Sequence, residues 1–281
     1  KNKKSLWYGK YLYDLYNKAY TPWHWQKELF EYANKLGLIC FSSVFDDTSI
    51  DFLEKINNPI YKISSFENTD LELIKNTSIK KKPVILSTGL ASLSEINSAV
   101  KILKKKIPQK FALLKCTSAY PAKSLDNNLH TIKDMSKKFK CVVGLSDHTE
   151  GIEIAIGATA LGAKIIEKHV KLEHDYSSVD SKFAIDTNEL KKLVQGCRNV
   201  FEAKGKIYYG PTKNEIPSLK SIRTLFFNKD LKKNHVITKK DIRRSRPGLG
   251  LKIKYLPKIL GKKIKKDIKI GTPVNFRLLK K

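Results

Sequence analysis

The 281-residue sequence is poor in residues that cross-link or anchor a protein. It has four cysteines and one methionine. The cysteines are widely spaced, which argues against a disulfide framework and indicates reduced thiols, so we expect a cytoplasmic protein. No apolar run approaches the ~18 residues of a membrane span, and no signal peptide is recognisable, so we expect no membrane partner. The cysteines are Cys40, Cys116, Cys141 and Cys197.

Arginine is also scarce, although the chain is strongly basic. The formal net charge is +28, from 55 Lys and Arg residues against 27 Asp and Glu residues. Such a charge raises the hypothesis of nucleic-acid binding. However, the excess is mostly lysine spread along the chain. Proteins that bind the nucleic-acid backbone more often use arginine side chains, which bind phosphate in a bidentate manner, or a clustered basic patch. We therefore expect lysine-rich solvated faces and no nucleic-acid partner. The arginines are Arg198, Arg223, Arg243, Arg244, Arg246 and Arg277.

Six apolar runs of strand length recur along the chain, and helix-like stretches alternate with them. This alternation predicts an α/β fold with a parallel sheet and right-handed crossovers. Ser92 and Glu95 form a capping-box pattern that predicts a helix start at Leu93. The predicted strands are Leu38–Val44, Ile60–Ser65, Val84–Thr88, Phe111–Thr117, Cys141–Ser146 and Ala163–Val170. The predicted helices are Asp47–Ile56, Thr69–Ile74, Leu93–Lys104, Leu129–Phe139, Ile152–Leu161 and Asn188–Glu202.

Polar residues follow the carboxyl end of nearly every predicted strand. A doubly wound sheet concentrates its site at one switch point, whereas polar residues at every strand end favour a (β/α)8 TIM barrel. Such a barrel needs eight strands, and six are recognisable. We therefore expect a TIM barrel lacking its first two strands, with two strand–helix units ahead of Lys1 in a longer protein. The aromatic segment Tyr11–Tyr32 is then predicted to form the loop and helix before the third barrel strand.

Two histidines occupy equivalent positions after the last two predicted strands. His148 ends the segment Gly144–His148, and His169 follows Glu167 and Lys168, 21 residues after His148. One strand–helix–strand step brings both imidazoles to the same edge of a parallel sheet, where ligands bind. Two adjacent imidazoles suit a divalent transition metal. A lone histidine would more simply cap its strand, but two in equivalent positions favour the metal site.

The carboxyl-terminal part of the chain differs in character. Residues 1–203 form the predicted barrel domain, and the Gly- and Pro-punctuated residues 204–217 form a predicted linker. Residues 218–281 form a predicted small domain, which at about 60 residues has a marginal core of its own. Its strand-like pieces are Thr224–Phe227, Ile264–Ile268 and Pro273–Phe276.

Six motifs, taken together and in order, closely resemble the sialic acid synthase family. Members of this family condense phosphoenolpyruvate with an amino-sugar aldehyde. Within the family, Thr21–Trp25 and Arg246–Lys252 look most like the branch that makes pseudaminic acid; the branches that make N-acetylneuraminate and legionaminate usually differ there. The motifs are Tyr61–Glu67, Ile85–Gly89, Lys115–Pro121, Gly144–Thr149, Glu167–His169 and Arg246–Gly250.

The resemblance implies a TIM barrel followed by an antifreeze-like (SAF) domain, in a homodimer formed by domain exchange. It implies a divalent metal, commonly manganese (Mn²⁺), held by His148 and His169. The positions that match phosphoenolpyruvate contacts are Ser43, Lys62, Ser65, Ser87, Ser118 and Ser146. The positions that match the sugar and reaction region are Glu67, Tyr120, Asp180 and, from the small domain, Arg246.

The chemistry of phosphoenolpyruvate agrees with these residue types. Its carboxylate and phosphate need one cation and several neutral donors, which Lys62 and the serines would supply. Glu67, or a glutamate on a strand outside this sequence, would handle the proton of the attacking water. His174 and Asp175 are either ordinary loop residues or groups that support the metal ligands, and Trp23 and Trp25 either fill a core or contact the sugar's methyl group.

Four alternatives to a pseudaminic-acid-forming synthase remain. The family also contains synthases of N-acetylneuraminate and legionaminate. A related class of keto-sugar-acid synthases uses phosphorylated aldoses, but it would need more arginines than Arg198 alone in the barrel. The missing strands also leave open a truncated, inactive copy that only binds ligands. A nucleic-acid-binding role is the least favoured.

Overall fold

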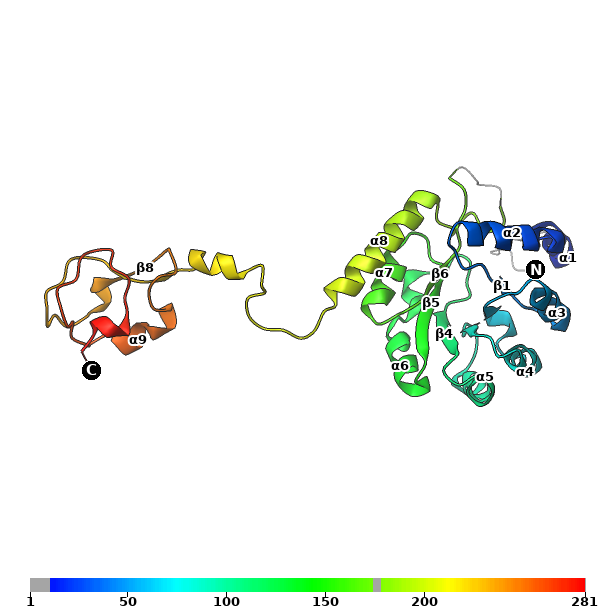
Figure 1. Cartoon of the computed structure of the whole chain (residues 1–281), viewed down its shortest axis with the longest axis horizontal. Helices are drawn as coiled ribbons and strands as arrows, with labels where there is room; N and C mark the ends of the chain where they lie inside the picture. Colours follow the sequence, from blue (N-terminus) through cyan, green and yellow to red (C-terminus); the bar gives the residue numbers. More distant parts are fainter. Residues whose placement is uncertain (1–10, 174–177, 281) are drawn as a thin grey trace. The chain divides into compact units, whose positions relative to one another are not determined.

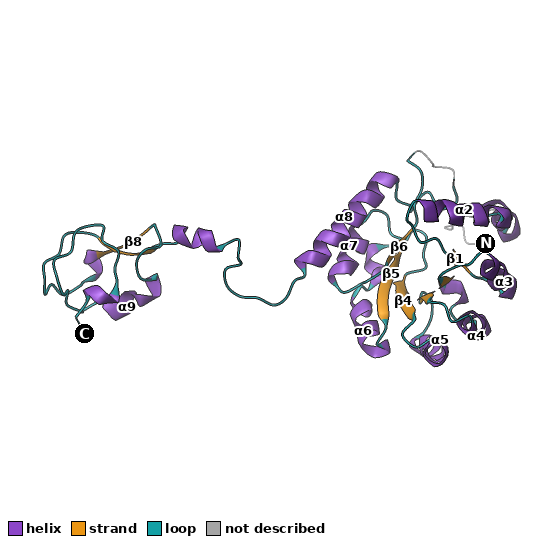
Figure 2. Ribbon diagram, in the orientation of Figure 1, coloured by secondary structure: helices purple, strands orange, loops and turns teal. Residues whose placement is uncertain are grey.

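The computed structural model describes residues 11–173 and 178–280. The chain divides into two compact units, residues 1–205 (unit 1) and 206–281 (unit 2). Unit 1 contains a six-stranded sheet in which the strands follow one another in chain order and each neighbouring pair is parallel (Figures 1 and 2). The strands are β1 (Ser42–Ser43), β2 (Tyr61–Ile63), β3 (Val84–Ser87), β4 (Phe111–Cys116), β5 (Val142–Asp147) and β6 (Ile166–Lys168).

This sequential, all-parallel order is the arrangement that the strand–helix alternation predicts. The helices follow one another around the outside of the curled sheet (Figure 1), as right-handed crossovers require. Among the described residues, β1 pairs with β2 alone and β6 with β5 alone, so this part of the chain forms a curled α/β half-barrel. The strand directions bring all six carboxyl ends to one edge, which is where the polar residues lie.

Local capping explains where several helices begin. The predicted capping box is confirmed, because Ser92 accepts from the backbone N–H of Glu95 while the Glu95 side chain bonds back to Ser92. Asp46 and Asp186 cap their helices in the same way. The helices of unit 1 are α1 (Leu12–Ala19), α2 (Trp23–Lys35), α3 (Asp47–Lys55), α4 (Leu71–Ile79), α5 (Leu93–Lys106), α6 (His130–Phe139), α7 (Glu153–Ala160) and α8 (Thr187–Ala203).

The core of unit 1 lies between the sheet and its helices. Ile63, Leu86 and Leu113 are buried in one hydrophobic cluster with apolar residues of the helices. In β2 and β3, Ile63 and Leu86 alternate with Lys62 and Ser87. Since successive side chains of a strand point to opposite faces, packing one face against the helices leaves the other face for polar groups.

Two predictions at the amino-terminal side of the sheet are wrong. The expected strand Leu38–Val44 is reduced to β1, and Leu38 and Ile39 are 61% and 70% exposed. No described strand pairs with β1 on its other side, so nothing there extends it. Tyr11–Tyr32 lies in two helices rather than in a loop and one helix.

The two tryptophans of this segment also do not fill a core. Trp25 is 54% exposed, and Trp23 is 47% exposed and stacks on Phe52 with the ring centroids 4.5 Å apart.

Unit 2 has a separate core around a short antiparallel pair. β7 (Thr224–Phe227) pairs with β8 (Ile242–Ser245), which the sequence analysis missed because Arg243 and Arg244 interrupt its apolar pattern. The predicted strands Ile264–Ile268 and Pro273–Phe276 are wrong, since they contribute only isolated bridges. The short helix α9 (Leu256–Ile259) completes the core. In the described part of the chain, every helix is too short or too polar to cross a membrane.

Candidate active site

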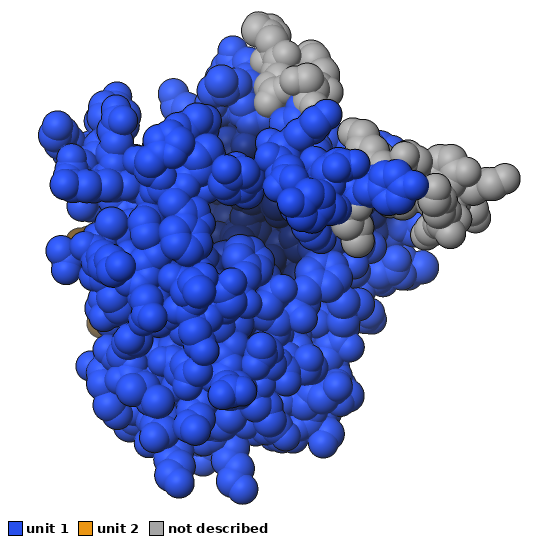
Figure 3. Space-filling view, turned by 90° about the vertical axis from the view of Figure 1, so that its right-hand side faces the viewer, with its two compact units in different colours: residues 1–205 blue, residues 206–281 orange. Residues whose placement is uncertain are grey.

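Strand register places a row of polar side chains on the inner face of the sheet. Ser43 is paired in register with Lys62, Cys116 with Ser146, and Ser146 with Glu167. Ser87 lies on the same face, because its register partner Leu114 is two residues before Cys116. The surface of unit 1 is hollowed on the side drawn in Figure 3.

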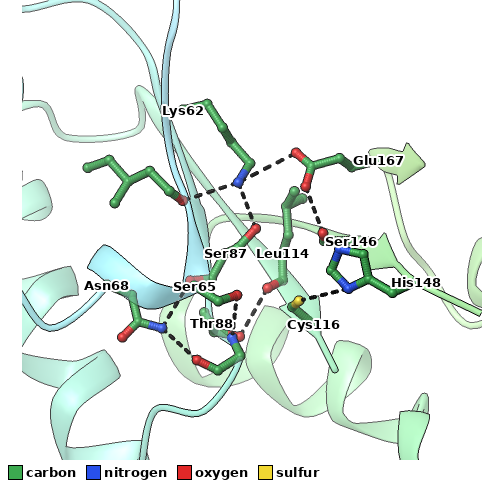
Figure 4. A network of polar contacts seen from close by, with 12 residues as sticks. Lys62, Ser65, Asn68, Ser87, Thr88, Leu114, Cys116, Ser146, His148 and Glu167 are labelled. Carbon is green, nitrogen blue, oxygen red and sulfur yellow. Dashed lines mark hydrogen bonds and ion pairs between the residues drawn. The ribbon is translucent and has the colours of Figure 1, made fainter. Parts of the chain in front are cut away.

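Lys62 is the buried cation of this face. Its Nζ lies 2.9 Å from Ser87 Oγ and 3.5 Å from Glu167 Oε2, and the Ile63 carbonyl accepts from it at 3.2 Å (Figure 4). Glu167 Oε1 in turn accepts from Ser146 Oγ at 2.6 Å. A single ammonium group thus joins β2, β3 and β6.

A second group of serines surrounds a glycine at the end of β3. The backbone N–H of Gly89 donates to Ser65 Oγ at 3.1 Å, and the Asn68 amide donates to the carbonyls of Ser87 and Gly89 (Figure 4). A Cβ on Gly89 would lie 2.2 Å from Ser118 Oγ and 2.7 Å from Ser65 Oγ. Only a residue without a side chain lets these hydroxyls gather here.

The two histidines meet as predicted, with ring centroids 5.3 Å apart. His148 Nδ1 lies 3.0 Å from the Thr117 carbonyl, and His169 Nδ1 lies 3.1 Å from Asp180 Oδ2. Because carbonyl and carboxylate oxygens only accept, each Nδ1 carries the proton and each neutral ring keeps an Nε2 lone pair.

This is the arrangement of histidines that bind metals, in which the second ring nitrogen is held by an oxygen. Within residues 11–173 and 178–280, no cluster of three or more His, Cys, Asp or Glu side chains could hold an ion. The pair alone offers two imidazole nitrogens, fewer than the three protein ligands of a typical catalytic zinc site or the four of a structural one, so a metal held here would take its remaining positions from water or substrate.

Aromatic rings pack against both histidines. Tyr120 lies 4.5 Å from His148, and Phe183, which is 1% exposed, lies 4.9 Å from His169 (both between ring centroids). Burial, together with the charge of Cys116, raises the pKa of Tyr120 to about 12. The phenol therefore stays protonated at neutral pH and can donate a hydrogen bond.

Cys116 and His148 are electrostatically coupled, with Cys116 Sγ 3.8 Å from His148 Nδ1. Burial raises the pKa of Cys116, but hydrogen bonds with His148 and Ser118 outweigh it and bring that pKa to about 7. Burial lowers the pKa of His148, but the hydrogen bond and charge of Cys116 outweigh it, so that pKa is above its ordinary value.

Glu67 is a different kind of acid. Burial raises its pKa, although the charge of Lys62 opposes this. Among the described residues, its Oε2 is buried without a hydrogen-bond partner. A carboxyl group with a raised pKa and a spare buried oxygen is suited to taking or giving a proton.

The structure therefore gathers most of the candidate residues in unit 1. Arg246 lies in unit 2, exposed, at the end of β8. His174 and Asp175 lie outside the described residues. The candidates that unit 1 contains are Ser43, Lys62, Ser65, Glu67, Ser87, Ser118, Tyr120, Ser146, His148, His169 and Asp180.

Some residues of this cluster were not among the predicted site residues. Glu167 could have been identified, because it precedes His169 by two residues in a strand and so shares its face. Asn68, in a 3-10 turn (Ser65–Glu67 and its cap), and Phe183, in the segment between β6 and α8, carry no such periodic signal.

Family models match both units. Residues 1–209 match the NeuB family. The chain belongs to the NeuB family. Residues 222–279 match the SAF domain, so the NeuB-type unit is followed by an SAF domain, as the sequence resemblance implies.

The NeuB-family relatives of this chain include several sialic-acid-type synthases. It is 40% identical to pseudaminic acid synthase of Helicobacter pylori over 96% of this chain and 80% of the relative. It is 38% identical to pseudaminic acid synthase of Campylobacter jejuni over 96% and 78%. The N,N'-diacetyllegionaminic acid synthase of Campylobacter jejuni is 36% identical over 86% and 74%. These relatives are condensing enzymes of the transferase class.

A solved NeuB-type structure agrees with this assignment. The N-acetylneuraminic acid synthetase of Leptospira borgpetersenii is 33% identical and superposes with a TM-score of 0.69, covering 76% of this chain and 75% of that one. The half-barrel therefore follows the fold of this enzyme family.

Proposed function

We propose that this protein is a pseudaminic acid synthase, which condenses phosphoenolpyruvate with 2,4-diacetamido-2,4,6-trideoxy-altrose to give pseudaminic acid and phosphate. The observation that carries the proposal is the inner face itself. One buried ammonium, a set of serine hydroxyls and a histidine pair stand on adjacent strands of a NeuB-family sheet. The identity of 38–40% to pseudaminic acid synthases over 96% of the chain supports this branch.

The serines and Lys62 are suited to the two anionic groups of phosphoenolpyruvate. Ser65 accepts from the Gly89 N–H. Ser87 accepts from Lys62, so its own hydroxyl proton can point at an anion. Lys62 adds the charge in a site of low dielectric constant, where a hydrogen bond to an ion is strong. Ser43 and Ser118 add further hydroxyls, whereas the Ser146 hydroxyl already donates to Glu167 and would have to leave it to bind an anion.

Glu167 limits this arrangement, because its carboxylate already pairs with Lys62. An incoming phosphate or carboxylate must compete with it for the ammonium. Glu167 therefore holds Lys62 and Ser146 in place until substrate arrives, and its own charge favours product release.

His148 and His169 would hold the divalent metal, manganese in our proposal. When bound, such an ion polarises the aldehyde oxygen of the sugar as a Lewis acid. Asp180 and the Thr117 carbonyl would fix the imidazoles, and Tyr120 and Phe183 pack against them. The methylene carbon of phosphoenolpyruvate attacks the aldehyde carbon, water adds to the second carbon, and phosphate leaves with cleavage of the carbon–oxygen bond.

We assign to Glu67 the role of accepting the proton of the attacking water. Its spare buried oxygen and its raised pKa, which burial causes, suit a group that exchanges a proton. Tyr120, which remains protonated, would donate to an oxygen of the acceptor sugar.

The proposal includes a homodimer in the cytoplasm, formed by domain exchange, in which Arg246 reaches the sugar site of a second copy. Its planar fork would bind a carboxylate or sugar hydroxyls in a way that lysine cannot reproduce. Mixing Arg246→Ala chains with His148→Ala chains, each inactive alone, should restore part of the activity once subunits exchange. Failure to recover activity despite demonstrated exchange would contradict domain exchange.

The deciding experiment measures phosphate release from phosphoenolpyruvate and the mass of the product with three acceptors and Mn²⁺. We expect turnover with the altrose-type acceptor and little with N-acetylmannosamine or the legionaminate precursor. Equal or better turnover with either of these would move the protein to that branch. Binding of phosphoenolpyruvate without turnover of any acceptor would identify an inactive binding copy.

A further inference from the structure

A buried ion pair joins strands β5 and β6 through the residues that immediately precede the two histidines. Lys168 Nζ lies 2.8 Å from Asp147 Oδ2, and the two side chains are 2% and 0% exposed. The two residues are paired in register between β5 and β6. Because side chains alternate along a strand, they lie on the face opposite Ser146 and Glu167.

These residues also hold the turn that carries His148. Asp147 Oδ1 accepts from the backbone N–H of Thr149 at 3.0 Å and from its hydroxyl at 2.8 Å. The Lys168 ammonium donates to the Thr149 carbonyl as well. One ammonium therefore contacts the residues on both sides of His148, and it belongs to the residue immediately before His169.

From this geometry we infer that Lys168 and Asp147 are positioning residues, which set the separation and orientation of the two imidazoles. The inference rests on the metal site of the proposed function. Ser146 and Glu167 cross-link the same two strands on the inner face, but they leave Thr149 untied. Within residues 11–173 and 178–280, the side-chain bonds of Lys168 and Asp147 couple the turn after β5 to β6.

A structural role alone would also predict that the pair matters, so the experiment must separate stability from positioning. Removing one partner leaves an uncompensated buried charge and destabilises a protein, whereas replacing both with apolar residues is often neutral or stabilising. We therefore compare Lys168→Met with the double variant Asp147→Leu/Lys168→Met. Lys82→Met is the matched control, since Lys82 forms an ion pair with Glu54 elsewhere in unit 1.

Two readouts are followed on the whole chain. Mn²⁺ affinity is titrated by electron paramagnetic resonance, and long-range ¹H–¹⁵N correlation spectra record the imidazole nitrogens in the metal-free protein. Loss of a group that hydrogen-bonds a metal ligand directly typically weakens metal binding 10–100-fold. Lys168 acts through the turn and not through such a bond, so we expect the lower end of that range, about tenfold. We expect about that loss in Lys168→Met, altered His148 nitrogen shifts, and neither change in Lys82→Met.

The double variant decides between the two roles. We expect it to recover the thermal midpoint of the wild type while keeping the weakened Mn²⁺ affinity and altered shifts; if Lys168→Met fails to fold, the double variant alone gives the comparison. Wild-type affinity and shifts in the double variant would overturn the inference. If the wild type itself binds no Mn²⁺, the metal site of the proposed function fails, and the imidazole spectra alone test the positioning role.

Discussion

Asp241 in unit 2 and Lys62 in unit 1 are both charged side chains removed from solvent, yet their partners come from different parts of the chain. Asp241 is bound by Lys229, His235 and Thr238, all within twelve residues of it. Lys62 is bound by Ser87 on the next strand and by Glu167 on the last.

The origin of the partners distinguishes a buried charge with a structural role from one with a functional role. The Asp241 carboxylate is held by groups from its own local segment: Oδ2 accepts from Thr238 and contacts His235, and Oδ1 pairs with Lys229. Lys62 is held by groups from three strands. One of these groups is the Glu167 carboxylate, which an anionic ligand can replace. A buried charge of the first kind should affect stability, and one of the second kind should affect activity.

The largest expected effect is at the histidine pair. His148→Ala or His169→Ala should lower metal-dependent turnover by about 1,000-fold or more, because a Lewis acid contributes several kcal/mol to such a barrier. Steady-state phosphate release with added Mn²⁺ measures this. His130→Ala, at the start of α6, is the control and should keep wild-type turnover. Chelator-resistant activity in His148→Ala would contradict the metal assignment.

Lys62→Met tests the functional side of the comparison directly. Loss of one partner of a buried, hydrogen-bonded charge pair costs about 3–4 kcal/mol, so kcat/KM for phosphoenolpyruvate should fall about 100–1,000-fold. Lys82→Met, with its half-buried partner Glu54, is the control. A loss of stability with unchanged kcat/KM would show that Lys62, like Asp241, has a structural role. It would contradict the distinction between structural and functional buried charges.

Asp241→Asn tests the structural side. Hydrogen bonds hold the pKa of Asp241 well below its ordinary value although burial opposes them. A lowered pKa means that the stabilisation is complete above the ordinary Asp pKa of about 3.9 and is lost as pH falls through the folded-state value. Asn should therefore cost about 1.5–3 kcal/mol at pH 7, and the difference should shrink below about pH 4.

Hydrogen exchange resolved by peptide measures this within residues 224–279. Phosphoenolpyruvate binding should be unchanged. Asp230→Asn, whose carboxylate pairs with Lys269 at the surface, should cost much less.

The smallest expected effect is a displaced pH profile. Metal binding needs a neutral imidazole, and Cys116 helps to raise the pKa of His148. Mn²⁺ affinity should therefore fall as pH drops through this raised pKa, by about tenfold per pH unit below it. In Cys116→Ala the fall should begin at lower pH. An unchanged profile in Cys116→Ala would show that Cys116 does not raise the pKa of His148.

The sequence was informative where the site follows strand periodicity. Lys62, Ser87, Ser146 and the two histidines lie at or near carboxyl ends of apolar runs, so the half-barrel order and most of the cluster could be predicted. Glu167 shares that periodicity but was not predicted as a site residue, because His169 alone was sufficient to give the Glu167–His169 motif a function.

Other features depend on tertiary contacts that no local pattern encodes. Phe183 reaches the histidines from an irregular segment, and Asn68 clamps Gly89 from a turn. The strand Leu38–Val44 was predicted too long because its apolar residues are typical of a strand, whereas pairing requires a neighbour. β8 was missed because its two arginines obscure the alternation.

The space around Gly89 is too small for any side chain at this position. Its φ is ordinary for any residue, so the glycine is required by the 2.2 Å that would separate a Cβ from Ser118 Oγ, and not by backbone conformation. One methyl group here would displace the hydroxyls without altering any charge. A Gly89→Ala substitution would therefore change the placement of the Ser65 and Ser118 hydroxyls separately from the charge of Lys62.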